Sequence, residues 1–430
     1  MQVNKNLLTA ALSILLFSVM GKGQTYSIVI KGGHVIDAKN NIDGLMDVAI
    51  NDGKIAMVAK NINAANAAQV VDAKGMYVTP GLIDIHGHVF AGTEPDHYLS
   101  NGLVAVAPDG FTFRVGVTTI VDAGGAGWRS FPTFKKNIID NSKTRVLSFL
   151  NIVGEGMRGG AYEQNPNDMD PKMAALIARN NKNYIVGFKV AHFEAADWVA
   201  VDKGVEAGKM ANLPVIVDFG GDDTHPPLSV KELFFKHLRP GDIYTHTFTE
   251  LDRRDPIVDV KTRQLRPFVK VAQQRGIVFD VGYGGGSFDF RQALPAIKAG
   301  FYPNTMSTDL HTGSMNGAMK DMLNVMSTFA AMGMSIPAII KASTWAPAQA
   351  IKHEELGHLS VGAIADVAIL NMRQGEFGIW DRMGYKVKAK QKFECEMTIK
   401  GGSIVYDLNG IATPVITPVV RRANSAATNH

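Results

Sequence analysis

The chain has 430 residues, of which 46% are apolar and 20% are charged, as in a globular protein with a sizeable core. The net charge of +4 falls to +2 without residues 1–23, which hold two lysines and no acidic residue. Such a small charge gives no reason to expect nucleic acid or a membrane surface as a partner, so we expect a small molecule. The single cysteine, Cys395, excludes an intramolecular disulfide and a thiolate-rich metal site.

Residues 1–23 have the pattern of a cleavable secretory signal peptide. A cationic Lys5 precedes an apolar run over residues 7–20, and the small residues Gly21 and Gly23 follow that run. The run is shorter than the roughly 20 apolar residues that cross a bilayer, which argues against a retained membrane anchor. The pattern predicts a secreted or periplasmic protein that is free of the membrane after cleavage.

The two ends of the remaining chain share one kind of pattern. From Tyr26 onward, brief β-rich runs alternate with turn signals such as "NDG", and the same pattern returns in "ECEMTIKGGSIVYDLNG". We predict that residues 24–80 and 354–412 form one small β-sandwich subdomain built from both chain ends. Residues 413–430 are small and polar, and we expect them to form a flexible tail.

Residues 81–353 repeat a pattern of an apolar strand followed by a helix. Eight runs fit strands: "GLIDIHG", "VTTIVDAG", "RVLSFLNIVG", "YIVGFKV", "LPVIVDFGG", "GDIYTHTF", "GIVFDVGYG" and "NTMSTDLH". Successive runs begin about one βα unit apart, so the fold class is α/β and the predicted architecture is a (β/α)8 TIM barrel. A doubly wound open sheet is the competing architecture, but it does not predict where the polar residues fall.

Candidate metal ligands follow these apolar runs. The active site of such a barrel lies at the carboxyl ends of its strands, and the residues there are His86, His88, Lys189, Asp218, His246 and Asp309. His86 and His88 are separated by one residue, so both imidazoles point to the same face of a strand and supply half of a metal site. A lone His-x-His pair is weak evidence. Its combination with ligands on other strands predicts a metal centre.

Lys189 is unusual in this set because metal ions repel an ammonium group. Burial favours the neutral amine of lysine, and a neutral amine can react with carbon dioxide. The resulting carbamate has two oxygens that suit a bridge between two metal ions. Alone, Lys189 would be interpreted as a salt-bridged lysine; beside the other ligands, we predict a carboxylated Lys189.

Several of these motifs together resemble the amidohydrolase superfamily, most closely its dihydroorotase-like amidohydrolase/deacetylase metallohydrolases. The motifs are "GLIDIHGH" on the first predicted strand, the lysine on the fourth, "THTF" on the sixth and "STDLH" on the eighth. The segment "STWAPAQAIKHEELGHLSVGAIADVAIL" is similar to the one that leads such chains out of the barrel. The resemblance covers most of residues 26–410, and it is specific for the superfamily but much less so for the substrate.

The resemblance implies two divalent metal ions. His86, His88 and Asp309 would hold one ion, His246 and carboxylated Lys189 would hold the other, and the carbamate would be shared. Zinc is the expected metal, with manganese as the alternative. The resemblance also implies a homo-oligomer.

The sequence departs from the family pattern at two positions. Asp218 stands where the family usually has a metal-binding histidine, so we expect a second site that is altered and uses aspartate as a ligand. Tyr283 stands where the family often has a histidine, and we place it near the substrate. Further candidates for substrate contact are His192 and His311, which could equally be loop histidines, and Arg158, which could bind a carboxylate in a bidentate pair or lie on the surface.

The predicted site supports metal-assisted hydrolysis. A bound metal lowers the pKa of its water toward about 7 and polarises the substrate carbonyl, so that a metal-bound hydroxide can attack. Asp309, at the end of the last strand, would take the proton of the nucleophile and pass it to the leaving nitrogen or oxygen.

We therefore predict a metal-dependent amidohydrolase or deacetylase that cleaves an amide or ester bond of a small acylated compound such as an N-acyl amino acid. The nearest alternative is a dihydroorotase-like hydrolase that opens a cyclic amide or imide. An alternative of another class is a non-catalytic barrel that only binds its ligand. Burial of so many polar groups without a metal would be costly, which favours the enzyme.

Overall fold

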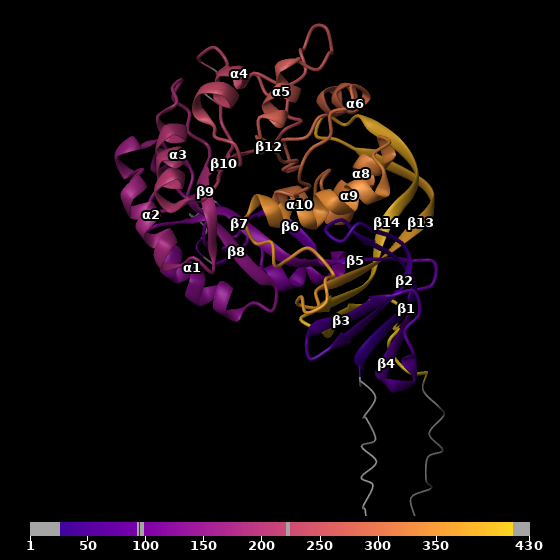
Figure 1. The fold of residues 1–430 in the computed structure, drawn as a ribbon. Coiled ribbons are helices and arrows are strands. Elements are labelled where there is room, and N and C mark those ends of the chain that lie inside the picture. The colour runs from indigo at the N-terminus through magenta and orange to yellow at the C-terminus, as the bar shows by residue number, and fades with distance from the viewer. Residues whose placement is uncertain (1–25, 93, 95–98, 221–223, 416–430) are drawn as a thin grey trace, which may run out of the picture.

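The computed structural model describes residues 26–92, 94, 99–220 and 224–415. These residues form two sheets, a curled parallel sheet surrounded by helices and a second sheet beside it (Figure 1). The predicted signal peptide lies outside the described residues, as does the predicted tail from residue 416 onward. None of the helices in the described ranges is long and apolar enough to cross a membrane.

Strands from both ends of the chain pair in one eight-stranded sheet of order β15-β14-β13-β5-β1-β2-β3, with β4 paired to β1. The two ends meet where β5 and β13 form an antiparallel ladder. The long β1 pairs β4 through residues up to Lys31 and β5 from His34 onward, so the sheet branches at this strand. The strands are β1 (Tyr26–Asp37), β2 (Ile42–Asn51), β3 (Lys54–Ala59), β4 (Ala67–Asp72), β5 (Tyr77–Pro80), β13 (Val367–Trp380), β14 (Lys386–Lys400) and β15 (Ser403–Asp407).

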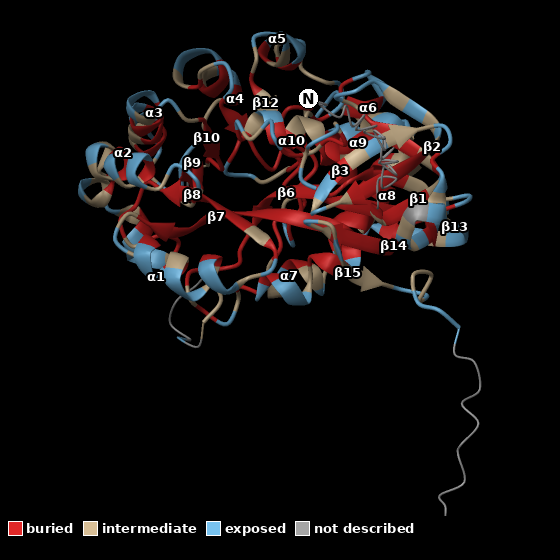
Figure 2. Cartoon of the chain, turned by 60° about the horizontal axis from the view of Figure 1, so that its bottom comes forward, coloured by how far each residue is buried: buried red, intermediate tan, exposed pale blue. Residues whose placement is uncertain are grey.

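The other sheet has seven parallel strands in the order β12-β11-β10-β9-β8-β7-β6. Every residue of β6, β7 and β9 is buried, as Figure 2 shows by their red ribbons. Continuous burial of this kind is typical of parallel strands that are covered on both faces. The strands are β6 (Leu82–Gly87), β7 (Val117–Gly127), β8 (Arg145–Asn151), β9 (Ile185–Val190), β10 (Val215–Val217), β11 (Ile243–Tyr244) and β12 (Val278–Phe279).

Helices connect these strands and cover the outer face of the curled sheet (Figure 1). In α2, Asp170 caps the first turn by accepting hydrogen bonds from the backbone of Lys172 and Met173, and small alanines on one side of the helix are buried. The helices are α1 (Phe131–Asn137), α2 (Pro171–Asn180), α3 (Val199–Ala211), α4 (Val230–Glu232), α5 (Phe268–Gln274), α6 (Phe290–Lys298), α7 (Thr312–Met315), α8 (Met322–Ala331), α9 (Ile336–Ser343) and α10 (Trp345–Ala350).

The predicted eighth strand, residues 304–311, is not a regular strand, and this corrects the expectation of eight equivalent strands. The segment lies between the two edges of the curled sheet and makes one isolated parallel bridge to each side, Asp280 with Thr305 and Gly87 with Leu310. Asp309 has a left-handed backbone with φ of 53°, which a continuous ladder does not accommodate. The sheet is therefore a curled half-barrel that continuous strand pairing does not close.

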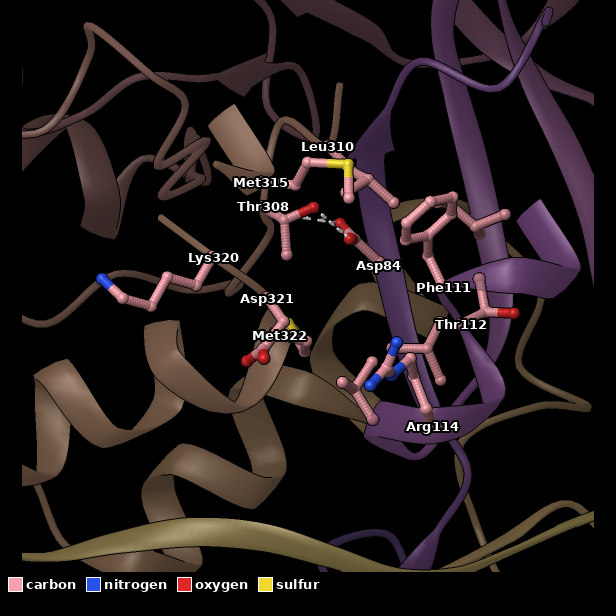
Figure 3. A pocket seen from close by; sticks show the side chains of 13 residues that line it. Asp84, Phe111, Thr112, Arg114, Thr308, Leu310, Met315, Lys320, Asp321 and Met322 are labelled. Carbon is pink, nitrogen blue, oxygen red and sulfur yellow. Dashed lines mark hydrogen bonds between the residues drawn. The ribbon is translucent and has the colours of Figure 1, made fainter. Parts of the chain in front are cut away.

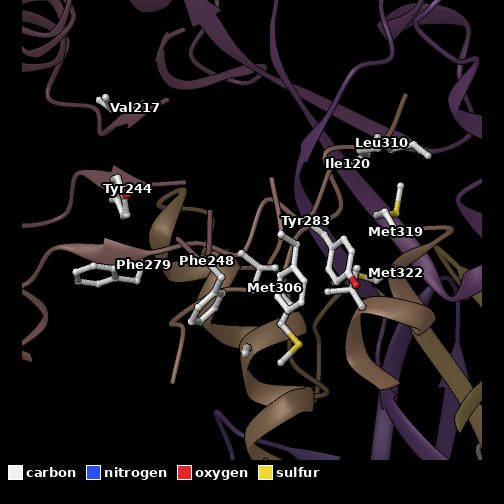
Figure 4. Packing of buried hydrophobic residues seen from close by; sticks show 14 of the residues in the cluster. Ile120, Val217, Tyr244, Phe248, Phe279, Tyr283, Met306, Leu310, Met319 and Met322 are labelled. Atoms are coloured by element: carbon white, nitrogen blue, oxygen red, sulfur yellow. The ribbon is translucent and has the colours of Figure 1, made fainter. Parts of the chain in front are cut away.

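Aromatic and methionine side chains form the packing on one side of this sheet. Figure 4 shows Tyr244, Phe248 and Phe279, which come from β11, β12 and the segment between them, beside Met306. Phe279 and Phe301 meet edge to face with their ring centroids 5.1 Å apart, an arrangement that aromatic rings prefer. This packing supports the segments that carry the polar residues of the strand ends.

Candidate metal centre

The six predicted ligands lie at or just beyond the carboxyl ends of β6, β9, β10 and β11 or, for Asp309, in the segment of residues 304–311, and all six are buried. His86 is in β6, Lys189 is in β9, and Asp218 directly follows β10. Their exposed fractions do not exceed 8%, so water solvates none of these polar groups well. The full set is His86, His88, Lys189, Asp218, His246 and Asp309.

Three of the ligands form a compact cluster. One nitrogen each of His86 and His88 and one oxygen of Asp309 lie within 4.8 Å of one another. The Nε2 atoms of His88 and His86 are 2.8 Å and 3.6 Å from the Asp309 Oδ1 atom. The Nδ1 atom of His88 is buried and has no hydrogen-bond partner among the described residues. Two imidazoles and a carboxylate are the donor set of many catalytic zinc sites, so the residues present fit a divalent ion.

A chain of hydrogen bonds sets the tautomer of His86. The Thr245 hydroxyl donates to Asp280 over 2.8 Å, which uses its only hydrogen. The Thr245 oxygen also lies 2.8 Å from His86 Nδ1, and it can therefore only accept a proton there. His86 consequently carries its proton on Nδ1 and keeps a lone pair on Nε2, the atom that faces Asp309. Metal-binding histidines are oriented by such outer hydrogen bonds.

The other three ligands form a second group beside the first. His246 Nε2 lies 3.3 Å from Asp218 Oδ2, and the His246 and His86 ring centroids are 5.0 Å apart. The Lys189 Nζ atom is 3.3 Å from His86 Nε2, and so it connects the two groups. His246 Nδ1 donates to the carbonyl of Gly282 at 2.5 Å, which leaves Nε2 as the atom available to a metal ion.

Burial controls the charge states of this centre. Burial, together with the nearby charge of Lys189, lowers the pKa of His86 to about 3, so the ring is neutral as metal binding requires. Burial also lowers the pKa of Lys189, while Asp218 and Asp309 act in the opposite direction. Burial alone would raise the pKa of Asp309, but the hydrogen bond from His88 and the nearby imidazoles hold it well below its usual range.

Three residues around the centre have left-handed backbone conformations. The φ angles are 55° at His246, 53° at Asp309 and 56° at His192. Asp and His adopt this region more readily than most residues, yet the conformation still costs free energy. Strained backbone at strand ends is common in active sites, where it aims side chains that a regular strand would point elsewhere.

Two of the predicted substrate residues lie next to the ligands. His192 Nε2 is 4.0 Å from Asp218 Oδ2, and His311 Nε2 is 4.0 Å from Asp309 Oδ2. His192 lines a cavity of about 240 Å³, which Asp218 and Arg254 also line. A site of this volume beside the ligands can hold part of a small substrate.

The other two predicted substrate residues are placed differently. The Arg158 guanidinium lies over the Tyr162 ring, 4.3 Å from its centroid. Arg158 is next in sequence to Gly159, which lines the 240 Å³ cavity together with His192. Tyr283 is fully buried among apolar side chains, as Figure 4 shows. It stacks on Phe288 with ring centroids 4.1 Å apart. Its hydroxyl donates to the backbone of Trp380, so the side chain points away from the metal ligands and we assign it no substrate role.

Several residues of the site were missed by the sequence analysis. Asp280 accepts the Thr245 hydrogen bond, buried Glu163 lies 2.9 Å from His192 Nδ1, and Arg254 forms an ion pair with Asp218. Asp280 could have been found, because it directly follows the apolar run of the predicted seventh strand. Thr245 lies inside the "THTF" motif, whereas Glu163, in a short 3-10 helix, and Arg254, in a loop, have no distinctive local pattern.

A separate cavity of about 160 Å³ lies between β6 and the segment around α8. Figure 3 shows Asp84, Thr308, Arg114 and Met322 around it, and Asp84 accepts hydrogen bonds from Thr308. None of the six candidate ligands, all of which are described, lines this cavity. Its buried carboxylate holds the segment of Asp309 against β6, which is a structural role.

Comparison with known proteins agrees with this geometry. The model of the amidohydrolase family matches residues 286–405. A deacetylase of Brucella anthropi is 31% identical over 375 residues, which cover 84% of this chain and 88% of the relative. The crystal structure of an adenine deaminase superposes with a TM-score of 0.79 at 27% identity, covering 89% of this chain and 100% of the other. The crystal structure of a dihydroorotase gives 0.75 at 28% identity, with coverages of 88% and 97%.

The similarity to the deacetylase extends over most of both chains, and the two solved structures share the overall fold. The chain belongs to the amidohydrolase superfamily, as its ligand pattern predicted.

Proposed function

We propose that the chain is a metal-dependent hydrolase that cleaves the carbon–nitrogen bond of a small acylated compound, such as an N-acyl amino acid. The observation that carries this proposal is the buried cluster of His86, His88 and Asp309 in a chain whose extended relative is named a deacetylase. Superfamily membership supports a hydrolase acting on carbon–nitrogen bonds. The acylated substrate rests on the relative's name and on the site.

A bound metal would supply Lewis-acid chemistry, by acidifying water and polarising the substrate carbonyl. The chain itself supplies orientation and proton transfer. Thr245 and Asp280 hold the His86 ring in the tautomer whose Nε2 faces the cluster. The Asp309 carboxylate lies beside His88, and we assign it the transfer of a proton from the attacking water to the leaving nitrogen. His311, next to Asp309, is a candidate for substrate contact.

We propose two divalent ions, with zinc as the metal. His86, His88 and Asp309 would hold the first, while His246, Asp218 and a carboxylated Lys189 would hold the second. The support is the 3.3 Å approach of His246 Nε2 to Asp218 Oδ2 and the complete burial of Lys189 between the two groups. A carbamate on Lys189 should give a ¹³C signal after growth or reconstitution with labelled bicarbonate, and Lys189→Ala should remove it.

The 240 Å³ cavity beside Asp218 is the proposed binding site of the substrate. We propose that His192 and Arg158 contact the acyl compound from this side, with Arg158 paired to a carboxylate of the substrate. An O-acyl ester could react at the same site. A ring-opening reaction on a cyclic amide is the second candidate, because the solved structure of a dihydroorotase shares the fold.

The deciding experiment measures hydrolysis by the zinc-loaded full chain on N-acyl amino acids, O-acyl hydroxy acids and cyclic imides. Deacylation gives two products and ring opening gives one, so mass analysis of the products separates the candidates. We expect deacylation that is lost after chelation and restored by zinc. Full activity after verified metal removal would contradict metal dependence. A fully metallated chain that turns over none of the three classes would favour the binding barrel.

A further inference from the structure

The carboxylate of Asp218 is divided between two partners. Its Oδ1 atom forms an ion pair with Nη2 of Arg254, while its Oδ2 atom faces His246 Nε2 at 3.3 Å. Asp218 is 8% exposed and Arg254 is 5% exposed, so solvent balances neither charge. Buried ions of opposite sign must then balance each other, and the loss of either one leaves the other uncompensated.

His246 directs its two ring nitrogens to two different partners. Its Nδ1 atom donates to the carbonyl of Gly282 at 2.5 Å, and Nε2 is the nitrogen that faces Asp218. A cation placed between Nε2 and the Asp218 Oδ2 atom would be bound by both, since imidazole nitrogen and carboxylate oxygen are common zinc ligands. The two atoms are therefore arranged as a pair of ligands.

Arg254 is suited to hold the other oxygen of this carboxylate. Its guanidinium stays charged at every physiological pH, and it lies over the Phe219 ring, 5.4 Å from the centroid. Burial and the ring restrict its orientation, so Asp218 is kept with one oxygen on Arg254 and the other toward His246. Hydrogen-bonded partners of this kind commonly orient metal ligands.

We propose that Arg254 is a positioning residue of the second metal site, and that the Asp218–Arg254 pair replaces a neutral histidine ligand. An aspartate alone would add one negative charge to the centre. The pair has no net charge, like a neutral imidazole, and it still offers a single donor atom. This inference rests on the proposed function, because it requires a second ion at His246 and Asp218.

The test is a double-mutant cycle on the full chain, with zinc per chain measured by plasma mass spectrometry across buffered zinc concentrations in bicarbonate. Arg254→Met should weaken the second zinc by about 10- to 100-fold, because Asp218 loses its orientation. Asp218→His alone should also weaken it, since it leaves the guanidinium buried and uncompensated. The double variant D218H/R254M should bind the second zinc more tightly than either single variant. A purely structural role for Arg254 does not predict this rescue.

Arg253→Met is the matched control, because Arg253 is exposed, precedes Arg254 and lines the same cavity; it should leave the zinc content unchanged. If the single variants do not fold, the zinc content of the double variant still tests the inference. Loss of the second zinc in the double variant would overturn it. Wild-type affinity in Arg254→Met, or a single zinc in the wild type, would also overturn it. Both of these outcomes leave the first ion and the proposed function standing, whereas a wild type without zinc would refute the proposed function itself.

Discussion

Thr245 connects His86 to Asp280, and the effect of removing its hydroxyl can be predicted. Thr245→Val keeps the shape of the side chain but removes the oxygen that lies 2.8 Å from His86 Nδ1. The ring then loses the partner that fixes its tautomer, and we expect about 10- to 100-fold weaker zinc binding at the first site. Competition with a chromogenic chelator measures the dissociation constant.

Thr249→Val is the control for this variant. Thr249 is also buried, but its hydroxyl has no hydrogen-bond partner among the described residues. The same change of group at Thr249 should therefore leave zinc affinity unaltered. Equal losses in the two variants would show that the effect comes from packing and not from the His86 tautomer.

Asp309 allows a second prediction at this scale. Asp309→Asn keeps the size of the side chain but cannot take up a proton, so turnover should fall by roughly 10²- to 10⁴-fold. Because Asp309 is also a candidate ligand, the comparison is made at saturating zinc with the metal content measured on the same sample. Asp252→Asn, an exposed residue in the loop after β11, carries the same charge change and should retain full activity. Near-normal turnover of a fully metallated Asp309→Asn would rule out its assigned role.

The individual ligands could be predicted because each one has a local signal. His86 and His88 have the spacing of one strand face, Lys189 and Asp218 follow apolar runs, and His246 and Asp309 lie in the motifs "THTF" and "STDLH". Asp280 also follows an apolar run and Thr245 lies in "THTF", but no local pattern shows which ligand each of them orients. Thr245 lies 159 positions from His86, and Arg254 lies 36 positions from Asp218 in a loop. Only the folded chain brings these partners together.

At the scale of elements, the predicted eighth strand is the segment whose structure the sequence pattern did not predict. The spacing of about one βα unit predicts a strand at residues 304–311, and the segment does lie between the two sheet edges. Its regular pairing is replaced by side-chain bonds, among them those from Thr308 to Asp84, and by the left-handed backbone of Asp309. The hydrophobic pattern does not predict these features, because they depend on a contact with Asp84, which is distant in the sequence.

Asp47 in β2 ties together three parts of the second sheet. Its carboxylate pairs with Lys31 and accepts hydrogen bonds from the backbone of Gly32 and Ile62. Burial alone would raise the pKa of Asp47, but these donors lower it below its usual value. A carboxyl whose folded pKa is depressed adds stability above its unfolded pKa of about 3.9, and that stability is lost as the pH falls through the folded pKa.

Asp47→Asn should therefore lower the free energy of unfolding by about 1–3 kcal/mol at pH 7. The difference from the wild type should shrink as the pH falls below about 4, because the wild-type carboxyl then becomes protonated as well. Urea unfolding of both proteins at pH 7, 5 and 3.5 measures this difference in the free energy of unfolding. Asp52→Asn, an exposed residue of the adjoining turn, should show no such difference. A penalty that persists unchanged at pH 3.5 would exclude the charge as its cause.

At the scale of the whole molecule, the pairing of both chain ends followed from their shared pattern of short strands and turns. In the structure, β5 and β13 form an antiparallel ladder that joins the two chain ends. This ladder fixes where the chain enters and leaves the curled sheet. The branch at β1 was not predictable, because one long strand that serves two partners has the same alternation as an ordinary strand. Ligand positions depend on the curled sheet, so the site could be located without knowledge of this branch.

We propose that the whole molecule is exported. Residues 7–20 form an apolar run after Lys5, and Cys395 is the only cysteine, so an oxidising compartment cannot form a disulfide within the chain. Expression in a Gram-negative host should give a periplasmic protein whose intact mass corresponds to cleavage near residue 23. Replacement of Leu15 and Leu16 by arginine interrupts the apolar run and should leave the full-length chain in the cytosol. Full-length wild-type protein in the cytosolic fraction would refute export, without affecting the metal centre.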